Sequence, residues 1–382
     1  MTENTLLYLW LTLKYRQNMP FFAKLVEDCG TIADVYERED YSDLQYLRGN
    51  DKKFLSDKSL KNAEKVIEEC KHLNIDIITF EDDNYPCKFR QLYQPPVVLY
   101  TKGKLPDFDN NIVISVVGAR DPIDSSRRVT DEIVRGLADN GFIIVSGLAY
   151  GIDSVAHKAA LMSQGVTTGF LARGLDKIYP VEHTELADFV MSSGGIISEY
   201  PPGVSANREN FNPRNRLISG IADGVIVVQA AEHSGTSLTV THAISQNKDI
   251  FVVPGDVYLF TLSNNLIKNG AKPVTCALDI IEEYMGVYPD KMIKQVQQID
   301  KPIIEKPEIK KTLKRENVVK ASDFVMTENE KNVYTAIQKS DGISFENLAK
   351  ELGYPAHILM SALSLLEMKG YVLKINGNYR IK

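Results

Sequence analysis

Apolar residues recur at helical spacing through the first 75 residues of the chain. Leu6, Trp10 and Leu13 fall on one face of a helix, and Phe22 belongs to a second apolar stripe. Residues 59–73 have the pattern of a third amphipathic helix. These patterns predict a small helical domain over residues 1–75.

From residue 110 onward, short continuous apolar runs alternate with glycine-containing turns and amphipathic stretches. Runs that are apolar at nearly every position are typical of strands buried on both faces of a parallel sheet. The predicted strands are residues 112–117, 142–145, 166–171, 195–197, 225–228 and 250–253. Strands that alternate with helices predict an α/β fold, here a Rossmann-like doubly wound sheet with right-handed crossovers.

Two shorter runs precede this sheet. Ile77-Ile78 indicate one strand and Val97-Val98 another, and Pro95-Pro96 favour extended backbone before the second. With these lead-in strands at residues 76–109, the Rossmann-like domain is predicted to span residues 76–288.

The C-terminal part has a different composition. Residues 289–325 are rich in Lys, Glu, Gln and Pro and have no sustained period, which predicts a solvated linker. Residues 326–382 carry three helical patterns, the last at 355–369, followed by apolar runs that flank Asn376-Gly377, a strong hairpin signal. Three helices and a hairpin predict a winged-helix domain.

Charge and cysteine content narrow the functional classes. The formal net charge is -6 and the sequence pI is about 5.7, which weighs against a protein that coats nucleic acid through bulk positive charge. If nucleic acid binds, particular arginines must be gathered by the fold. The four cysteines form no CxxC pair, and the histidines have no HExxH partner, so no metal site is expected. We expect no membrane segment and a cytoplasmic location, because no apolar stretch is long enough to span a bilayer.

Candidate binding residues follow the ends of the predicted strands, where ligands of doubly wound sheets bind. Gly118-Ala119-Arg120 follows the first strand, where helical N–H groups and a guanidinium favour an anion. Ser146-Gly147 end the second strand and allow close backbone approach to a ligand. Asp153, a few residues later, is expected to cap the next helix.

Two further segments carry candidate contacts. A short loop with Arg208 before it supplies cations, an amide and an aromatic face, through Phe211, Arg214, Asn215 and Arg216. Such a set suits a single strand bound by its backbone and by stacking, although a helix start with solvated arginines explains it equally well. A predicted helix begins at Ser234-Gly235-Thr236. The hydroxyls and N-terminal amides of this segment can either hold a phosphate or only cap the helix.

Two nucleotide-binding motifs are missing. Arg120 occupies the second glycine position that a GxGxxG turn requires, and no Walker A sequence is present. Dinucleotide and ATP binding are therefore disfavoured, and no cofactor or catalytic residue is predicted.

Taken together, the segments resemble the DNA-processing protein A (DprA, also called Smf) family of bacterial natural transformation. The strings that carry the resemblance lie between residues 76 and 284: Val117-Gly118-Ala119-Arg120, residues 146–153 with Ala156-His157, Ile178-Tyr179-Pro180, Ser198-Glu199-Tyr200-Pro201, Phe211 with Arg214-Asn215-Arg216, Ser234-Gly235-Thr236, Val253-Pro254-Gly255, and Asn265-Leu266-Ile267 with Gly270-Ala271.

The resemblance implies that the protein forms a homodimer and that it is not an enzyme. It implies binding of incoming single-stranded DNA, loading of the RecA recombinase and displacement of single-strand-binding protein. The family's principal DNA-binding arginine corresponds to Arg120, with Ala119 in place of a serine. Arg208, Phe211, Arg214 and Arg216 correspond to further members of the DNA site. Gln229 departs from the family, which usually has an acidic residue there.

Two other functions stay open at this point. A phosphoribohydrolase of the lysine-decarboxylase-like Rossmann group would need a catalytic glutamate, but threonine occupies its position in Gly235-Thr236-Ser237-Leu238-Thr239. A transcription regulator would read bases with residues 355–369, but Lys369 is the only firm cation there.

Overall fold

In a computed structural model of the chain, the described residues are 3–232, 234–287, 328–340, 343–354, 371–375 and 378–381, together with Leu359, Ala362, Leu363 and Leu366. They fall into two compact units, residues 1–302 and 303–382, which are described separately.

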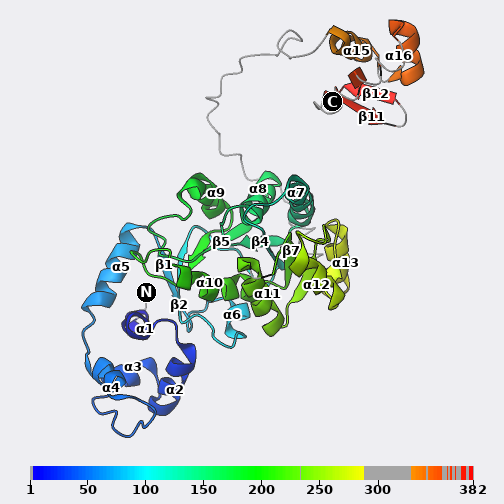
Figure 1. The fold of residues 1–382 in the computed structure, drawn as a ribbon. Helices are drawn as coiled ribbons and strands as arrows, with labels where there is room; N and C mark the ends of the chain where they lie inside the picture. Colours follow the sequence, from blue (N-terminus) through cyan, green and yellow to red (C-terminus); the bar gives the residue numbers. More distant parts are fainter. Residues whose placement is uncertain are drawn as a thin grey trace. The chain divides into compact units, whose positions relative to one another are not determined.

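One nine-stranded sheet runs through the first unit (Figure 1), in the order β1-β2-β6-β5-β4-β3-β7-β8-β9. The strands from β6 to β9 are parallel, and β2 and β1 continue that edge in antiparallel pairing. The strands are β1 Asp76–Thr79, β2 Val98–Lys102, β3 Val113–Gly118, β4 Ile143–Ser146, β5 Thr167–Leu171, β6 Ile196–Ser198, β7 Gly224–Val228, β8 Asp249–Val252 and β9 Lys272–Pro273.

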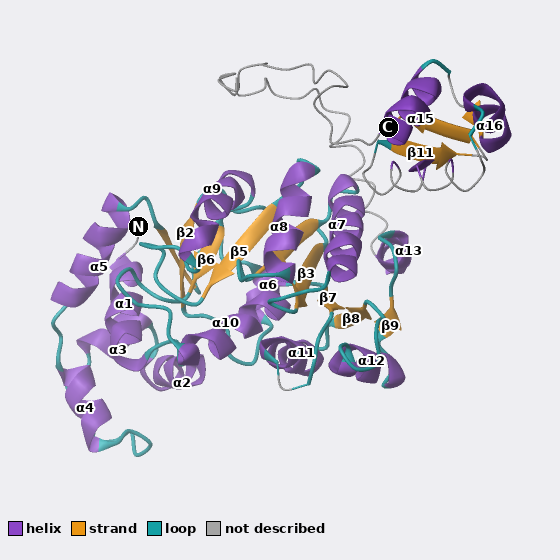
Figure 2. Cartoon of the chain, turned by 45° about the horizontal axis from the view of Figure 1, so that its top comes forward, coloured by secondary structure: helices purple, strands orange, loops and turns teal. Residues whose placement is uncertain are grey.

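Helices cover both faces of this sheet (Figures 1 and 2). α7, α8 and α13 share one core with one face, and α6, α10, α11 and α12 share another with the opposite face. These helices, with α9 and the short 3₁₀ helix η1, are α6 Cys87–Arg90, α7 Asp124–Asp139, α8 Ile152–Met162, η1 Val181–His183, α9 Thr184–Ser193, α10 Arg208–Ile221, α11 Gly235–Ser245, α12 Thr261–Lys268 and α13 Leu278–Val287. The predicted Rossmann-like α/β fold is confirmed, and each of the six predicted strands begins and ends within one residue of its observed position.

The N-terminal helices pack against the antiparallel edge of the sheet. Leu9 and Leu25 belong to the same buried cluster as Tyr100 of β2 and Ile196 of β6. Gln17 links the two parts directly: its amide donates to the carbonyls of Val98 (3.1 Å) and Glu199 (3.0 Å). The helices are α1 Glu3–Tyr15, α2 Met19–Cys29, α3 Ile32–Glu37, α4 Gly49–Ser56 and α5 Lys61–His72. A domain boundary at residue 75 stays a prediction. Among the helices described, none is both long and apolar enough to cross a bilayer.

The second unit has a small buried core of its own. Its three strands pair antiparallel in the order β10-β12-β11. Its elements are α15 Glu328–Gln338, β10 Ile343–Ser344, α16 Phe345–Leu352, β11 Val372–Ile375 and β12 Asn378–Ile381. Three of the segments predicted here lie outside the described residues: the linker at 289–325, most of the helix at 355–369 and the Asn376-Gly377 turn. The winged-helix domain therefore stays a prediction.

One local prediction is wrong. The segment from Phe211 to Arg216 is expected to be a short loop, but it lies inside α10, with Pro213 within the helix. Asn and Pro have low helix propensity, which explains the expectation. Burial of Leu217, Ile218 and Ile221 against the sheet outweighs that propensity, because tertiary packing supplies most helical stability in proteins.

A fully buried histidine in α8 gives the fold a pH dependence. His157 Nδ1 lies 2.7 Å from the hydroxyl of Thr167, which itself donates to the Ile144 carbonyl (2.9 Å). Nδ1 therefore carries the proton. Nε2 is buried with no partner among the described residues. Burial lowers the pKa of His157 to about 3, and nearby His183 adds a smaller effect in the same direction.

We therefore expect stability to fall as the pH drops from the ordinary histidine value of 6.5 toward 3, because the unfolded chain binds a proton that the folded chain rejects. This residue contributes a slope of up to about 1.4 kcal/mol per pH unit in that window. His157→Asn keeps a donor for Thr167 and should flatten the slope by one proton. Urea unfolding across this pH range, followed by the fluorescence of the single tryptophan Trp10, measures it. Equal slopes for the two proteins would contradict the assignment.

Candidate nucleic-acid interface

The sheet has its topological switch point between β3 and β7. Successive strands run outward from β3 in one direction and from β7 in the other, and ligands of such sheets bind at the carboxyl ends there. The backbone after β3 is fixed on both sides: Ala119 N–H donates to Val228 O (3.3 Å), and Ala119 O accepts from Ile152 N–H (3.1 Å). The next side chain, Arg120, is exposed to solvent.

Arg120 stands apart from the helix that follows it. α7 begins at Asp124, and the N–H of its N-cap residue, Ile123, donates to the Gln229 side chain (2.8 Å). The expected contribution of this helix N-terminus at Arg120 is therefore not observed. The guanidinium of Arg120 is therefore the group at this position that could contact an anion.

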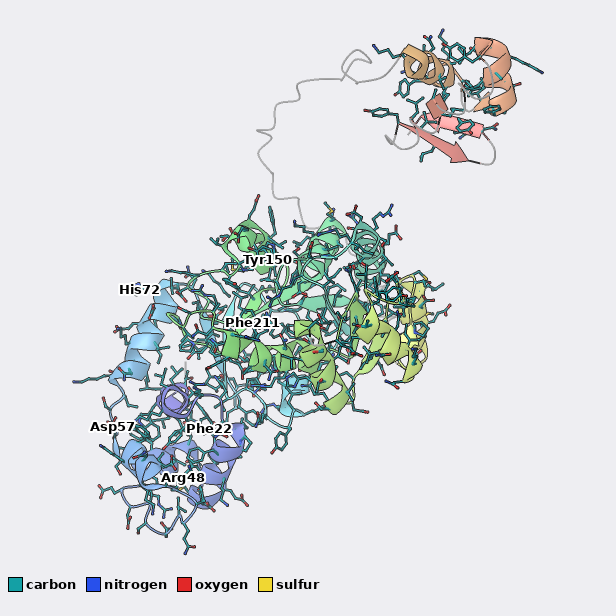
Figure 3. The ribbon with its side chains drawn as sticks, viewed as in Figure 1. Phe22, Arg48, Asp57, His72, Tyr150 and Phe211 are labelled. Carbon is teal, nitrogen blue, oxygen red and sulfur yellow. The ribbon has the colours of Figure 1, made fainter. Side chains whose placement is uncertain are left out.

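Two guanidinium groups lie over one aromatic ring. The guanidinium carbons of Arg120 and Arg214 are 5.7 Å and 5.6 Å from the centre of the Phe211 ring. Tyr179 meets the same ring edge-on, with centroids 6.2 Å apart and an interplanar angle of 69°. Phe211 and Tyr150 are labelled in the central part of the first unit in Figure 3. The arrangement combines positive charge with aromatic surface.

These side chains surround a small cavity, here called the Phe211 cavity, of about 70 Å³. Four of the residues predicted from the sequence line it: Arg120, Gly147, Phe211 and Arg214. A space of this size holds a phosphate oxygen or a few waters, since one water occupies about 30 Å³ in the liquid. The cavity thus suits an anion better than a base.

Arg214 is buried and serves as a structural cation. Its Nη1 donates to the Gly147 carbonyl (2.8 Å) and to the Phe170 carbonyl, and its Nε donates to Asn215 Oδ1 (3.1 Å). Burial lowers the pKa of Arg214 to about 10, against the attraction of Asp153, and neighbouring Arg120 lowers it further. The side chain still carries its charge at neutral pH.

Gly147 is enclosed between that cation and a carboxylate. Its N–H donates to Asp153 Oδ2 (3.1 Å). A Cβ at this position would lie 2.6 Å from Arg214 Nη1 and 2.8 Å from Asp153 Oδ2, so a larger residue would displace both charged groups. Burial raises the pKa of Asp153, and Arg214 and the backbone N–H groups oppose that shift.

The capping role predicted for Asp153 is wrong, because Gly151 is the N-cap of α8. The carboxylate faces back to the β4–α8 loop and holds it in place.

Several of the predicted residues form hydrogen bonds within the protein that hold the elements around the site in place. The Ser146 hydroxyl is buried and donates to the Val116 carbonyl (2.7 Å). The Thr236 hydroxyl donates to the Gly118 carbonyl (2.9 Å), and the Asn215 amide donates to the Gly235 carbonyl (3.4 Å). These bonds tie α10 and α11 to the end of β3. The hydroxyls of Ser146 and Thr236 are thus engaged within the protein.

The remaining predicted residues lie outside the Phe211 cavity. Arg216 forms a buried ion pair with Glu199, at a different position on α10 from Arg214. Arg208 is exposed at the first position of α10. Gly235 is exposed at the start of α11, and its N-cap Ser234 has a buried hydroxyl without a partner among the described residues.

Two tyrosines that the sequence does not predict as site residues also line the Phe211 cavity. Tyr150 follows β4 and Tyr179 follows β5, and their side chains are 44% and 50% exposed. Both come after the carboxyl ends of parallel strands, the signal that selects Arg120 and Gly147. The same rule, applied to aromatic as well as polar residues, would have found them.

The fold and the site define a Rossmann-like protein with a cavity at its switch point that is lined by arginines and aromatic rings. The model of the family described as DNA recombination-mediator protein A matches residues 76–285. The chain is 36% identical over 221 residues to the DNA processing protein DprA of Bacillus subtilis, covering 57% of this chain and 74% of the relative. It is 37% identical over 205 residues to that of Streptococcus pneumoniae, covering 53% and 72%. The chain belongs to the DNA recombination-mediator protein A family.

Two solved structures agree with this placement. The X-ray structure of DprA from Streptococcus pneumoniae is 31% identical and superposes with a TM-score of 0.54, covering 68% of this chain and 96% of that protein. The second is the structure of DprA from Helicobacter pylori, which was reported with a single-stranded DNA binding mode of that protein. Its sequence is 30% identical to this chain, and the superposition has a TM-score of 0.52 and covers 56% of this chain and 97% of that protein.

The burial of Arg214 predicts that its loss destabilises the fold. Arg214→Ala leaves Asp153 buried without its cation and two carbonyls without their donor, so we expect a loss of about 3–5 kcal/mol. Arg214→Lys keeps the charge but loses the Nε donor to Asn215 Oδ1, and should lose less. Urea unfolding followed by Trp10 fluorescence measures both variants. The matched control is Arg120→Ala, an exposed change expected to stay within about 0.5 kcal/mol of wild type. An unchanged Arg214→Ala midpoint would contradict the structural role.

Proposed function

We propose that this chain binds single-stranded DNA without altering it chemically, at the Phe211 cavity. The observation that carries the proposal is the placement of the Arg120 and Arg214 guanidiniums over the Phe211 ring. Arg120, which is exposed, contacts a phosphate, and buried Arg214 adds a fixed charge behind it. Backbone contact together with aromatic stacking is the usual way to hold a single strand without reading its sequence.

A single strand fits this site better than a duplex, because only unpaired bases offer free faces to an exposed ring such as Tyr179. The description of the Helicobacter pylori relative by its single-stranded DNA binding mode supports the proposal. We propose Arg208, one turn before Phe211 on α10, and the Ser234-Gly235 start of α11 as further DNA contacts. Gly118, Ala119, Ser146, Asn215 and Thr236 then position the site, and Arg216 acts through Glu199.

The partners follow from the same function. We propose that the chain acts as a cytoplasmic homodimer that protects incoming DNA, displaces single-strand-binding protein and loads the RecA recombinase during natural transformation. The family's description as a recombination mediator supports this role.

The hydrolase alternative is not favoured. Thr239, at the position where that group has its catalytic glutamate, is buried in α11. Asp153, whose carboxylate accepts the N–H of the cavity-lining Gly147, is buried and holds the β4–α8 loop, so it is not free to act as a general base.

Replacing Arg120 should test the DNA site without disturbing the fold. Arg120→Ala is expected to weaken binding of every single-stranded sequence alike, because a phosphate contact carries no base information. The slope of log affinity against log salt should fall by ~0.7 for one lost contact. Binding of labelled oligo-dT and of the matching duplex at several salt concentrations measures both effects.

Arg48→Ala is the matched control. It removes the same charge from an exposed position at the start of α4, in the N-terminal helices and away from Phe211 (Figure 3). It should leave both the affinity and the slope unchanged. A slope that Arg120→Ala does not alter, or equal affinity of the wild type for single strand and duplex, would refute the assigned site.

A further inference from the structure

A second, larger hollow adjoins the Phe211 cavity. This hollow, here called the Tyr179 groove, has a volume of about 660 Å³ and lies along η1 and the start of α9. Tyr150, Arg173, Tyr179 and Pro180 line both spaces. A ligand chain that leaves the Phe211 cavity past these residues therefore enters the Tyr179 groove.

The two spaces differ in what they can accept. Binding sites for small organic ligands usually measure roughly 300–1,000 Å³, so the Phe211 cavity at about 70 Å³ is too small for a nucleotide. The Tyr179 groove lies within that range. A strand whose phosphate is held at Arg120 must therefore place its bases outside the Phe211 cavity.

Aromatic rings stand at the junction between the two spaces. Tyr179 lies edge-on to Phe211, at 6.2 Å between ring centres. Tyr150 is held by a hydrogen bond from its hydroxyl to Glu182 (2.6 Å) and by an edge contact with His183 at 5.1 Å. Both tyrosines remain about half exposed, so each offers ring surface to a ligand at little conformational cost.

The charges of the Tyr179 groove also suit a nucleic-acid strand. Lys102 and Lys177 line it, and neither has a side-chain partner within the part of the chain that the structure describes. Two of its acidic groups are already engaged: Asp176 accepts the Gly203 N–H (3.0 Å) and lies 4.0 Å from Arg173, and Glu182 accepts the Tyr150 hydroxyl. Of the lining carboxylates, Asp188 alone has no such partner among the described residues.

We propose that the Tyr179 groove is a base-binding subsite for the nucleotides that adjoin the phosphate held at Arg120. Their bases lie against Tyr179 and Tyr150, and Lys177 contacts the backbone between them. This inference rests on the proposed function, because it takes the strand to be anchored at the Phe211 cavity.

An abasic oligonucleotide separates the two sites. It keeps the phosphates of oligo-dT of the same length and lacks the bases, so the affinity difference between the two probes reports base contacts alone. Tyr179→Ala should weaken oligo-dT binding about tenfold, a typical effect for one stacked base, and leave abasic binding unchanged. Tyr150→Ala should act in the same direction. Tyr179→Phe, which keeps the ring, should restore the difference between the probes.

Lys177→Ala should instead weaken both probes and reduce the salt slope by ~0.7. The control is Tyr93→Ala, which removes a tyrosine that is 88% exposed and lines neither space. It should bind both probes as the wild type does.

The inference is overturned if Tyr179→Ala and Tyr150→Ala bind oligo-dT as tightly as the wild type. It is also overturned if they lose oligo-dT and abasic binding equally, since the tyrosines would then only shape the phosphate site. The proposed function fails by a different result. In that case Arg120→Ala binds the abasic oligonucleotide as tightly as the wild type does. The two hypotheses can therefore fail separately.

Discussion

The proposed DNA-binding face of this protein depends on one buried cation, Arg214. Arg214 reaches from α10 to the carbonyls that end β4 and β5, and its charge faces Asp153 across Gly147. A buried charge is tolerated only when it is paired and hydrogen-bonded, so the contact fixes α10 against the strand ends. The position of Phe211, one turn earlier on the same helix, follows from that anchor. The aromatic surface at the switch point is therefore set by a contact inside the protein.

This anchoring separates the arginines by role. Arg214 and Arg216 lie two residues apart on α10, but each has its charge committed internally, one near Asp153 and the other against Glu199. Arg120 lies on a loop whose backbone is held by β7 and α8, and its side chain stays in solvent. An exposed guanidinium on a fixed backbone can bind a phosphate with little loss of order, whereas a buried one already has its partners.

The sequence predicts the sheet better than the site. Continuous apolar runs such as residues 112–117 have few alternatives to a buried parallel strand, and the helices between them follow from the alternation. The start of α10 is not predicted as a helix because Asn212 and Pro213 have low helix propensity. The helix forms because its apolar face is buried against the sheet, and a local sequence pattern does not show that packing. The role of Arg216 depends on Glu199, which lies on a different element, and no local pattern reveals that pairing. Tyr150 and Tyr179 follow predicted strands, but their juxtaposition depends on the strand order.

Net charge is a poor guide to a site of this kind, because the local field depends on how each carboxylate is paired. The chain carries a formal charge of -6, yet the acids around the cavity are engaged: Asp153 near Arg214, Glu199 with Arg216, and Glu182 with the Tyr150 hydroxyl. Within the described residues, Arg120 has no carboxylate at ion-pair distance. Its guanidinium therefore stays exposed beside the Phe211 ring, in a protein that is acidic as a whole. In the proposed binding mode, a strand held there at a few phosphates is not coated along its length, so its neighbouring nucleotides remain accessible to another protein.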